Sequence, residues 1–479
     1  MRHTLLVLAL AGLALAAPSA TGPAAAQSAI SNQQSTIGTA HDRLARDILK
    51  ELVEIDTTDS IGDNTKAAEA MAARLKAAGV PTDDVRVLGP NPRKGNLVAR
   101  LRGTGKARPI LLLAHLDVVE ARKEDWSPDL DPFRFIEREG FFYGRGTTDD
   151  KAMAAIWIAN LIRYTQEGLV PDRDLIVALT SDEEGGDYNG VDWLLQNHRP
   201  LIEADYCLNE GGGGDLKKGR RLTNNVQAAE KVYLSFRLEA RNPGGHSSLP
   251  TKDNAIYHLA GGLARLAAYD FPVRLSEVTR GYFARMAAVE TGQTAADMKA
   301  VSQPTPDPDA VKRLADQSPW YNAQIRTTCV ATRLEGGHAD NALPQTARAT
   351  VNCRMLPGAD PKEIAQTLVR VLDDDKITVT PIGQPRPSQP SPLRPDVMGP
   401  IERVTSEMWP GVPVVPTMST GATDGLYLRN AGIPVYGVDG IFTDVDDTRA
   451  HGRDERLGAK EFYEGREFLY RLVKALAGR

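Results

Sequence analysis

The sequence has few cysteines, no strong excess of either charge and no long apolar run after its first residues. Its 479 residues include 3 cysteines, too few for a disulfide-built scaffold or a zinc finger made of thiolates. The 57 Lys and Arg residues against 62 Asp and Glu residues give a formal net charge of −5, whereas a nucleic-acid-binding domain would be basic. No later stretch reaches the roughly 18 apolar residues of a membrane-spanning helix. Any metal site must therefore be built from histidine and carboxylate side chains.

The composition is that of a globular protein with more than one domain. Hydrophobic residues make up 42% of the chain and charged residues 25%, which excludes a long disordered or fibrous protein. At about 150 residues per domain, the length fits three domains, or two if one of them is large.

The first 26 residues have the pattern of a signal peptide. Arg2 and His3 precede an apolar run over residues 4–17, and Ala24 to Ala26 before Gln27 form an A-x-A cleavage site. The apolar run is too short to span about 30 Å of hydrocarbon. We therefore expect export to the periplasm or the medium, with no stable membrane anchor after cleavage.

Residues 27–228 have the pattern of an α/β catalytic layer. Apolar runs at 109–114, 175–179 and 204–208 predict buried strands, and residues 151–165 predict a helix between the first two. Strands that alternate with helices indicate a mainly parallel sheet.

Residues 229–384 predict a smaller, inserted domain. The run at 231–240 alternates between apolar and polar residues, as a half-exposed antiparallel strand does. The β-α-β-β-α-β order of predicted elements is the ferredoxin-like split motif, interrupted at 271–320 by a helical insertion. Beyond a proline-rich linker, residues 385–479 return to the catalytic layer. The predicted elements of the smaller domain are a strand at 231–240, a helix at 254–268, strands at 325–334 and 346–355, a helix at 361–373 and a strand at 377–380.

Five polar clusters follow the predicted strands of the catalytic layer, at the edge where open parallel sheets place their sites. In His115-Leu116-Asp117 the two polar side chains project on the same side, because strand side chains alternate. Each cluster alone could be a helix cap or a solvated loop. Together they supply two histidines and at least three carboxylates, which suits zinc, or cobalt or manganese in its place. The five clusters are residues 115–117, 144–151, 180–186, 208–214 and 450–455.

In spacing and order these clusters resemble those of the dinuclear zinc peptidases of the glutamate carboxypeptidase, aminoacylase and succinyl-diaminopimelate desuccinylase superfamily, from about residue 41 onward. The resemblance implies a catalytic domain with a mainly parallel sheet and an inserted ferredoxin-like α+β lid. It implies two Zn²⁺ per chain, with Asp149 as the bridge between them. Glu183 falls on the general base, and Asp117 on the residue that orients the first histidine. The implied ligands are His115, Asp149 and Glu210 for one zinc and Asp149, Glu184 and His451 for the other.

The lid also resembles this superfamily. Gly244-Gly-His246-Ser-Ser is similar to the motif whose histidine reaches a neighbouring active site in dimeric members, which implies a homodimer through the lid and His246 as a donor to the oxyanion. Asn341 and Arg354 resemble contacts to a substrate carboxylate, and the loop around Gly421 resembles one beside the substrate. Residues 325–328, 336–337 and 341–344, together with the insertion in the lid, are most similar to the carboxypeptidase S and N-acyl-amino-acid hydrolase branch, although that branch often has Asp where Glu210 stands.

The resemblance implies a hydrolase that cleaves amide bonds of small peptides or N-acyl amino acids with a free carboxylate. The alternative is a catalytically silent relative that binds peptides, but neither a ligand nor the base is missing. A doubly wound nucleotide-binding enzyme is excluded because no G-x-G-x-x-G follows the first strand. Cys329 and Cys353 lie on two neighbouring predicted strands, where a cross-strand disulfide and two unlinked thiols both remain open.

Overall fold

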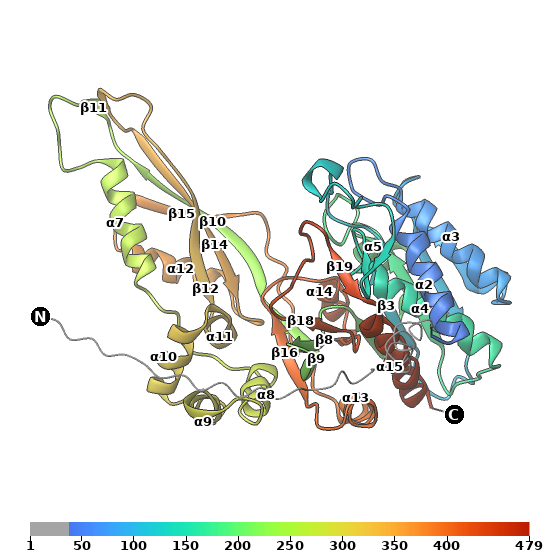
Figure 1. Cartoon of the computed structure of the whole chain (residues 1–479). Coiled ribbons are helices and arrows are strands. Elements are labelled where there is room, and N and C mark those ends of the chain that lie inside the picture. The colour runs from blue at the N-terminus through green and yellow to red at the C-terminus, as the bar shows by residue number, and fades with distance from the viewer. Residues whose placement is uncertain (1–37, 479) are drawn as a thin grey trace, which may run out of the picture.

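Two large sheets, accompanied by two smaller ones, organise the chain, as the computed structural model of residues 38–478 shows (Figure 1). A ten-stranded sheet forms the catalytic half, and a four-stranded sheet forms the lid. The predicted signal peptide, residues 1–26, lies outside the described residues. Within the described range, no helix is both long and apolar enough to cross a membrane.

The centre of the large sheet is parallel, as predicted. Strand β3 (Ile110–His115) lies between β6 (Leu175–Thr180) and β7 (Tyr206–Asn209) and runs parallel to both. All residues of these three strands are buried, which explains why each strand is apolar up to its last residue. Strand β17 (Val435–Gly437) pairs with β7 in parallel, so the end of the chain completes a sheet that the beginning started.

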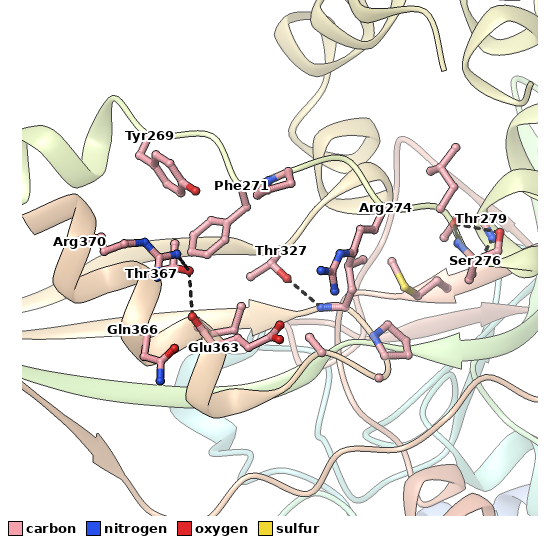
Figure 2. A pocket seen from close by; sticks show the side chains of 18 residues that line it. Tyr269, Phe271, Arg274, Ser276, Thr279, Thr327, Glu363, Gln366, Thr367 and Arg370 are labelled. Atoms are coloured by element: carbon pink, nitrogen blue, oxygen red, sulfur yellow. Dashed lines mark hydrogen bonds between the residues drawn. The ribbon is translucent and has the colours of Figure 1, made fainter. Parts of the chain in front are cut away.

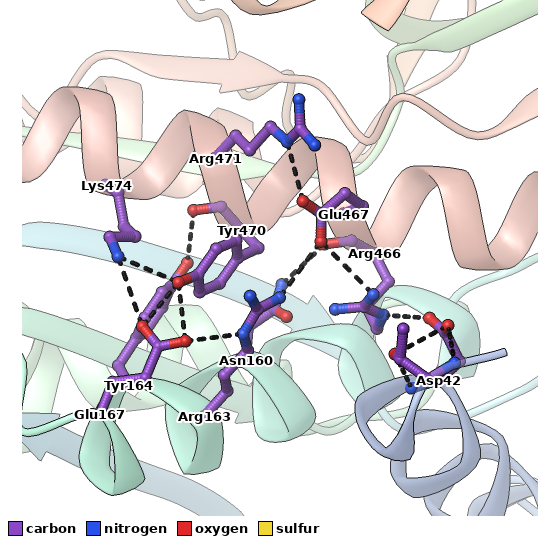
Figure 3. Close-up of polar contacts among 11 residues, drawn as sticks. Asp42, Asn160, Arg163, Tyr164, Glu167, Arg466, Glu467, Tyr470, Arg471 and Lys474 are labelled. Carbon is purple, nitrogen blue, oxygen red and sulfur yellow. Dashed lines mark hydrogen bonds and ion pairs between the residues drawn. The ribbon is translucent and has the colours of Figure 1, made fainter.

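Three helices from distant parts of the sequence pack together beside this sheet. Helix α4 (Lys151–Gln166) contacts both α2 (Ala40–Val53) and α15 (Ala459–Ala477). Figure 3 shows the polar contacts that join them: Arg466 Nε donates to Asp42 Oδ1 at 2.7 Å, and Asn160 Nδ2 donates to the Arg466 carbonyl. The described N-terminal and C-terminal helices therefore belong to one layer.

The large sheet extends beyond the strands that the sequence predicts. Strands β8 (Gly213–Lys217), β9 (Arg220–Glu230) and β16 (Val414–Ser419) widen it toward the lid. In β9, buried polar side chains interrupt the apolar pattern; Asn224 Nδ2, for example, donates to the Thr405 hydroxyl at 2.9 Å. Satisfied polar groups can be buried, and such a strand has no apolar signature to read.

The lid sheet is fully antiparallel, with β10 and β14 at its centre. Its element order matches the predicted β-α-β-β-α-β motif, and the strand order β12-β14-β10-β15 is that of a ferredoxin-like sheet. The insertion contributes four short helices, of which α8 packs against β16 of the large sheet. The elements are β10 (Val232–Arg241), α7 (Ala255–Ala267), α8 (Glu277–Met286), α9 (Gly292–Val301), α10 (Pro308–Gln317), α11 (Pro319–Ile325), β12 (Thr328–Gly336), β14 (Thr346–Met355), α12 (Pro361–Leu372) and β15 (Ile377–Ile382).

The two faces of the lid sheet differ. In β10, Val232, Leu234 and Phe236 are buried against α7 and α12, while Tyr233 and Arg237 point to the other side and are exposed. The two helices lie on the side of the sheet away from the catalytic half (Figure 1). We call the opposite, uncovered side the open face; it turns toward the catalytic half.

A disulfide joins the two strands at one end of this sheet. Cys329 of β12 and Cys353 of β14 are direct partners in the register, with Cα atoms 4.1 Å apart, and are bonded. The structure thus decides between the two alternatives that the sequence left open. Cys207, on β7, is a buried free thiol.

Candidate metal centre

The five predicted ligands converge at the carboxyl edge of the large sheet. His115 ends β3, Glu184 and Glu210 follow β6 and β7, Asp149 precedes α4, and His451 lies between β18 (Phe442–Asp444) and β19 (Arg456–Gly458). Their ligand atoms form two groups, His115–Asp149–Glu210 and Asp149–Glu184–His451, each within 4.8 Å. These are the two trios that the resemblance implies, and Asp149 belongs to both.

Asp149 presents one carboxylate oxygen to each trio. Its Oδ1 is 2.9 Å from His115 Nε2, and its Oδ2 is 3.0 Å from His451 Nε2. His451 Nε2 is also 2.7 Å from Glu184 Oε1, and His115 Nε2 is 3.9 Å from Glu210 Oε2. A carboxylate whose two oxygens face two imidazole nitrogens has the arrangement of a bridging ligand.

The main chain of Asp117 holds the first histidine in the orientation that a ligand needs. His115 Nδ1 is 2.9 Å from the Asp117 carbonyl oxygen, which can only accept, so Nδ1 carries the proton and Nε2 is left for the cluster. The Asp117 carboxylate is farther away, at 3.6 Å. Its Oδ2 instead accepts from the Glu184 amide at 2.9 Å. Asp117 therefore positions a residue of each trio.

The charges in the cluster are strongly coupled. Burial alone would raise the pKa of Asp149, but its contacts with the His115 and His451 imidazoles hold that pKa well below its ordinary value. Hydrogen bonds to Asp149 and Glu184 raise the pKa of His451 to about 10. Burial raises the pKa of Glu210 well above its usual range. Such a concentration of acids favours positive charge, and carboxylates with imidazoles are the donors that zinc prefers.

Glu183 stands beside the trios but belongs to neither. Burial raises its pKa to about 10, and the negative charges of Glu210 and Asp424 add to this effect. A carboxylate with a raised pKa holds a proton more firmly, as a general base must. Because cations lower the pKa of carboxyls beside them, divalent ions in the trios would bring this group back toward neutral pH.

A buried ion pair that the sequence did not reveal supports both sides of the centre. Glu455 is fully buried and pairs with Arg145 at 2.7 Å. Glu455 Oε1 accepts from the Thr148 amide at 2.8 Å, next to Asp149, while Arg145 donates to the Gly452 carbonyl at 3.1 Å, next to His451. Both residues lie inside the polar clusters, but their pairing across the fold has no sequence signal.

The loop around Gly421 borders the same centre. It follows β16 and ends in Asp424, whose carboxylate is buried and accepts from Asn189 Nδ2 at 2.6 Å and the Thr180 hydroxyl at 3.2 Å. Within the loop, the Gly421 amide donates to the Ser419 hydroxyl. Since Thr180 ends β6, the loop lies at the strand ends that carry Glu183.

The three predicted site residues of the lid lie at two different ends of it. His246, in β11 (Gly245–His246), and Asn341 lie together at the lid tip, where the Ser247 amide donates to the Asn341 carbonyl. The tip is the end of the lid far from the large sheet (Figure 1). Arg354 lies at the other end, near the base of β14. At about 3.4 Å per residue, the 10 residues of β14 separate its ends by roughly 30 Å.

One chain therefore does not bring Asn341 and Arg354 to the same carboxylate, as the resemblance had implied, nor His246 to its own trios. Arg354 is half-buried on the open face, where its guanidinium lies 5.0 Å from the centre of the Tyr233 ring. Within residues 38–478 it has no ion-pair partner, so it is available to an anion.

Cavity size does not mark this centre. A cavity of about 520 Å³ lies elsewhere, between α12 and residues 269–276, where Tyr269, Phe271 and Arg274 are among its lining residues (Figure 2). It contains none of the predicted site residues. The converging ligand atoms, rather than the volume, locate the site.

Comparison with known proteins agrees with this geometry. The sequence profile described as "Peptidase family M20/M25/M40" matches residues 111–475. The N-fatty-acyl-amino acid synthase/hydrolase PM20D1 of Homo sapiens is 27% identical over 376 residues, which are 77% of this chain and 74% of that protein. The probable carboxypeptidase S-like 2 of Dictyostelium discoideum is 26% identical over 393 residues, 79% of this chain and 74% of that protein.

A solved structure shares the fold. The M20 family metallo-carboxypeptidase Sso-CP2 from Sulfolobus solfataricus superposes with a TM-score of 0.65 at 18% identity, covering 90% of this chain and 99% of that one. The similarity spans the catalytic half and the lid together.

Proposed function

The chain belongs to peptidase family M20/M25/M40, and from that premise we propose that it hydrolyses amide bonds of small peptides or N-acyl amino acids that bear a free carboxylate. The observation that carries the proposal is the convergence of two histidines and two further carboxylates on Asp149, with Glu183 beside them. Both the base and the full ligand set are in place, which disfavours a catalytically silent peptide-binding relative.

We propose two zinc ions as the cofactor, with cobalt or manganese as substitutes. His115, Asp149 and Glu210 would hold one ion, and Asp149, Glu184 and His451 the other. The donor set fits, because it consists of imidazoles and carboxylates with one carboxylate shared. The chemistry that such ions supply when bound is a water of lowered pKa and a polarised carbonyl.

The residues of the chain then divide the work. Glu183 takes the proton of the attacking water and returns it to the leaving amine. His246 donates to the developing oxyanion. Arg354 holds the substrate carboxylate, since a guanidinium can bind it through two parallel hydrogen bonds.

This assignment predicts a strong preference for a free carboxylate. An unmatched guanidinium in a partly desolvated cleft costs about 1–3 kcal/mol, so amidated analogues should react roughly tenfold or more slowly. Arg354→Ala should lower kcat/KM for the carboxylate substrates and so reduce the difference in kcat/KM between acids and amides. Arg354→Lys should recover only part of the natural kcat/KM for the acids, because an ammonium lacks the planar fork of a guanidinium. The measurement is kcat/KM on a panel of dipeptides, N-acyl amino acids and their C-terminal amides.

Arg237 offers a matched control. It is an exposed arginine on the same open face, four residues along β10 from Tyr233 and so farther from the base of the lid. Arg237→Ala should leave the discrimination unchanged. Equal efficiency of the natural protein on acids and amides would contradict both the role of Arg354 and the carboxypeptidase-like assignment.

We also propose that the protein is a homodimer through its lid. The proposal is supported by the position of His246 and Asn341 at the lid tip and by exposed apolar side chains on the lid: Leu249 is 75%, Leu334 70% and Tyr257 65% exposed. In such a dimer the tip of one lid serves the site of the other chain.

A mixture of two impaired variants tests the dimer. His246→Ala and Glu183→Gln should each be nearly inactive alone, yet the mixed dimer has one site with both groups intact. Random pairing of symmetric dimers should then restore about a quarter of the natural activity. If the mixture were no more active than the separate variants, and the protein sedimented as a monomer, the proposed dimer would be refuted.

We propose export as the location, to the periplasm or the medium. The signal-like pattern of residues 1–26 supports it, and so does the Cys329–Cys353 disulfide, because such bonds persist in oxidising compartments.

A further inference from the structure

A lysine is buried where the chain crosses from the large sheet into the lid. Lys231 lies between β9 and β10 and is 1% exposed. Its ammonium donates to the Arg326 carbonyl at 2.7 Å and to the Thr328 hydroxyl at 3.3 Å. Within the described residues, no carboxylate forms an ion pair with it. Burying a charge without a counter-charge costs free energy. We therefore look for a function that explains why a lysine is buried here.

Glu230, the adjacent residue, and Asp270, which pairs with the hydrogen-bond partner of Lys231, are each paired with an arginine. The adjacent Glu230 turns to the catalytic half, where it pairs with Arg429 at 2.7 Å and accepts from the Thr423 amide and hydroxyl. Asp270 pairs with Arg326 at 2.7 Å. Neither of them neutralises Lys231.

Lys231 contacts a direct neighbour of Arg354. It immediately precedes β10, and its ammonium reaches the Thr328 hydroxyl of β12 at 3.3 Å. Tyr233 and Thr328 are the two direct partners of Arg354 in the register, one on each neighbouring strand. Thr328 therefore lies beside Arg354 and at the same time accepts from Lys231.

We propose that Thr328 and Lys231 complete, with Arg354, the site for the substrate carboxylate. The Thr328 hydroxyl accepts from the Lys231 ammonium, which leaves its own proton to donate to a carboxylate oxygen bound by Arg354. Lys231 acts through Thr328 as a positioning and charge-supplying residue. The inference rests on the proposed function and names two further residues that determine its specificity.

The ionisation of Lys231 gives the site a pH dependence. Burial, together with the positive charge of Arg354, lowers the pKa of Lys231 to about 7 in the free protein. A bound anion raises this pKa, because it favours the charged form. Carboxylate binding should thus be strongest below pH 7 and weaken as the pH rises through the pKa of the free protein. The other charged groups around Lys231 are Arg354 and the Arg326–Asp270 pair.

Lys231→Met tests the proposal in the zinc-loaded full-length protein. For an N-acyl amino acid, KM should rise roughly tenfold below pH 7, its ratio to the KM of the C-terminal amide should become independent of pH, and kcat should stay within about twofold. The KM of the C-terminal amide depends on pH only through the metal centre. The ratio of the KM of the acid to that of the amide therefore isolates the effect of Lys231 ionisation. Thr328→Val should show a smaller rise, and Thr328→Ser should restore natural binding. Lys252→Met, at an exposed lysine of the lid, is the control and should change nothing.

A binding measurement separates failure of this inference from failure of the proposed function. In the Glu183→Gln background, calorimetry with N-acetyl-L-phenylalanine and its amide measures carboxylate recognition without turnover. Weaker binding of the acid alone on replacing Lys231 supports the inference even if the natural protein hydrolyses neither compound. Unchanged binding of the acid, or equal loss for acid and amide with a lowered Tm, would overturn it.

Discussion

Glu183→Gln should abolish turnover and leave the metal content near two ions per chain. The residue stands outside both ligand trios, so its replacement removes a proton acceptor and no metal ligand. General bases contribute about 10²–10⁴-fold to the rate, and we expect a loss at the upper end because the amide to be cleaved is unactivated. Steady-state rates together with elemental analysis of the purified variant provide the measurement.

The neighbouring glutamate is the matched comparison. Glu184→Gln makes the same chemical change one position along the chain, but at a member of the second trio. It should lose one metal ion along with activity. If Glu183→Gln instead turned over normally, or lost metal as Glu184→Gln does, the assignment of the base would be wrong.

Asp149→Ala should remove both metal ions and all activity. Each of its two oxygens faces the imidazole of a different trio, so one substitution withdraws a ligand from both sites. Single ligands of either site should cost less: His451→Ala is expected to retain the ion held by His115 and Glu210. Metal titration by calorimetry, with circular dichroism to show that the fold persists, distinguishes the two outcomes.

Asp150→Asn is the control for this prediction. Asp150 is the next residue and is likewise buried, but it belongs to neither trio. It should keep both ions. Two tightly bound ions in Asp149→Ala would show that the carboxylate does not bridge.

The sequence predicts those elements whose type and burial can be read from the pattern of apolar residues within one short segment. Buried parallel strands such as β3 and β6 are apolar up to their last residue, and β10 alternates because helices cover one of its faces. The polar clusters at the strand ends indicated where the site lies, because parallel strands end at one edge, and the resemblance to the zinc peptidases assigned the individual ligands to the two trios.

What the sequence does not reveal depends on partners far apart in the chain. Arg145 and Glu455 are separated by 310 positions, and neither residue signals the pairing by itself. Strand β9 was missed because its buried polar groups are satisfied by distant partners. The separation of Asn341 from Arg354 follows from the length of the lid sheet, which spacing in the sequence does not convey.

The insertion of the lid has a consequence for the order of assembly. Strands β7 and β17 pair side by side, although the whole lid lies between them in the sequence. During synthesis, four of the five ligands are therefore made before the lid. The fifth, His451, is made only after the whole lid has been synthesised. Contacts between such distant segments form slowly, and a partly finished sheet exposes unpaired edges meanwhile. The second trio is thus a late product of biosynthesis, and a chain cut short after the lid would have an incomplete centre.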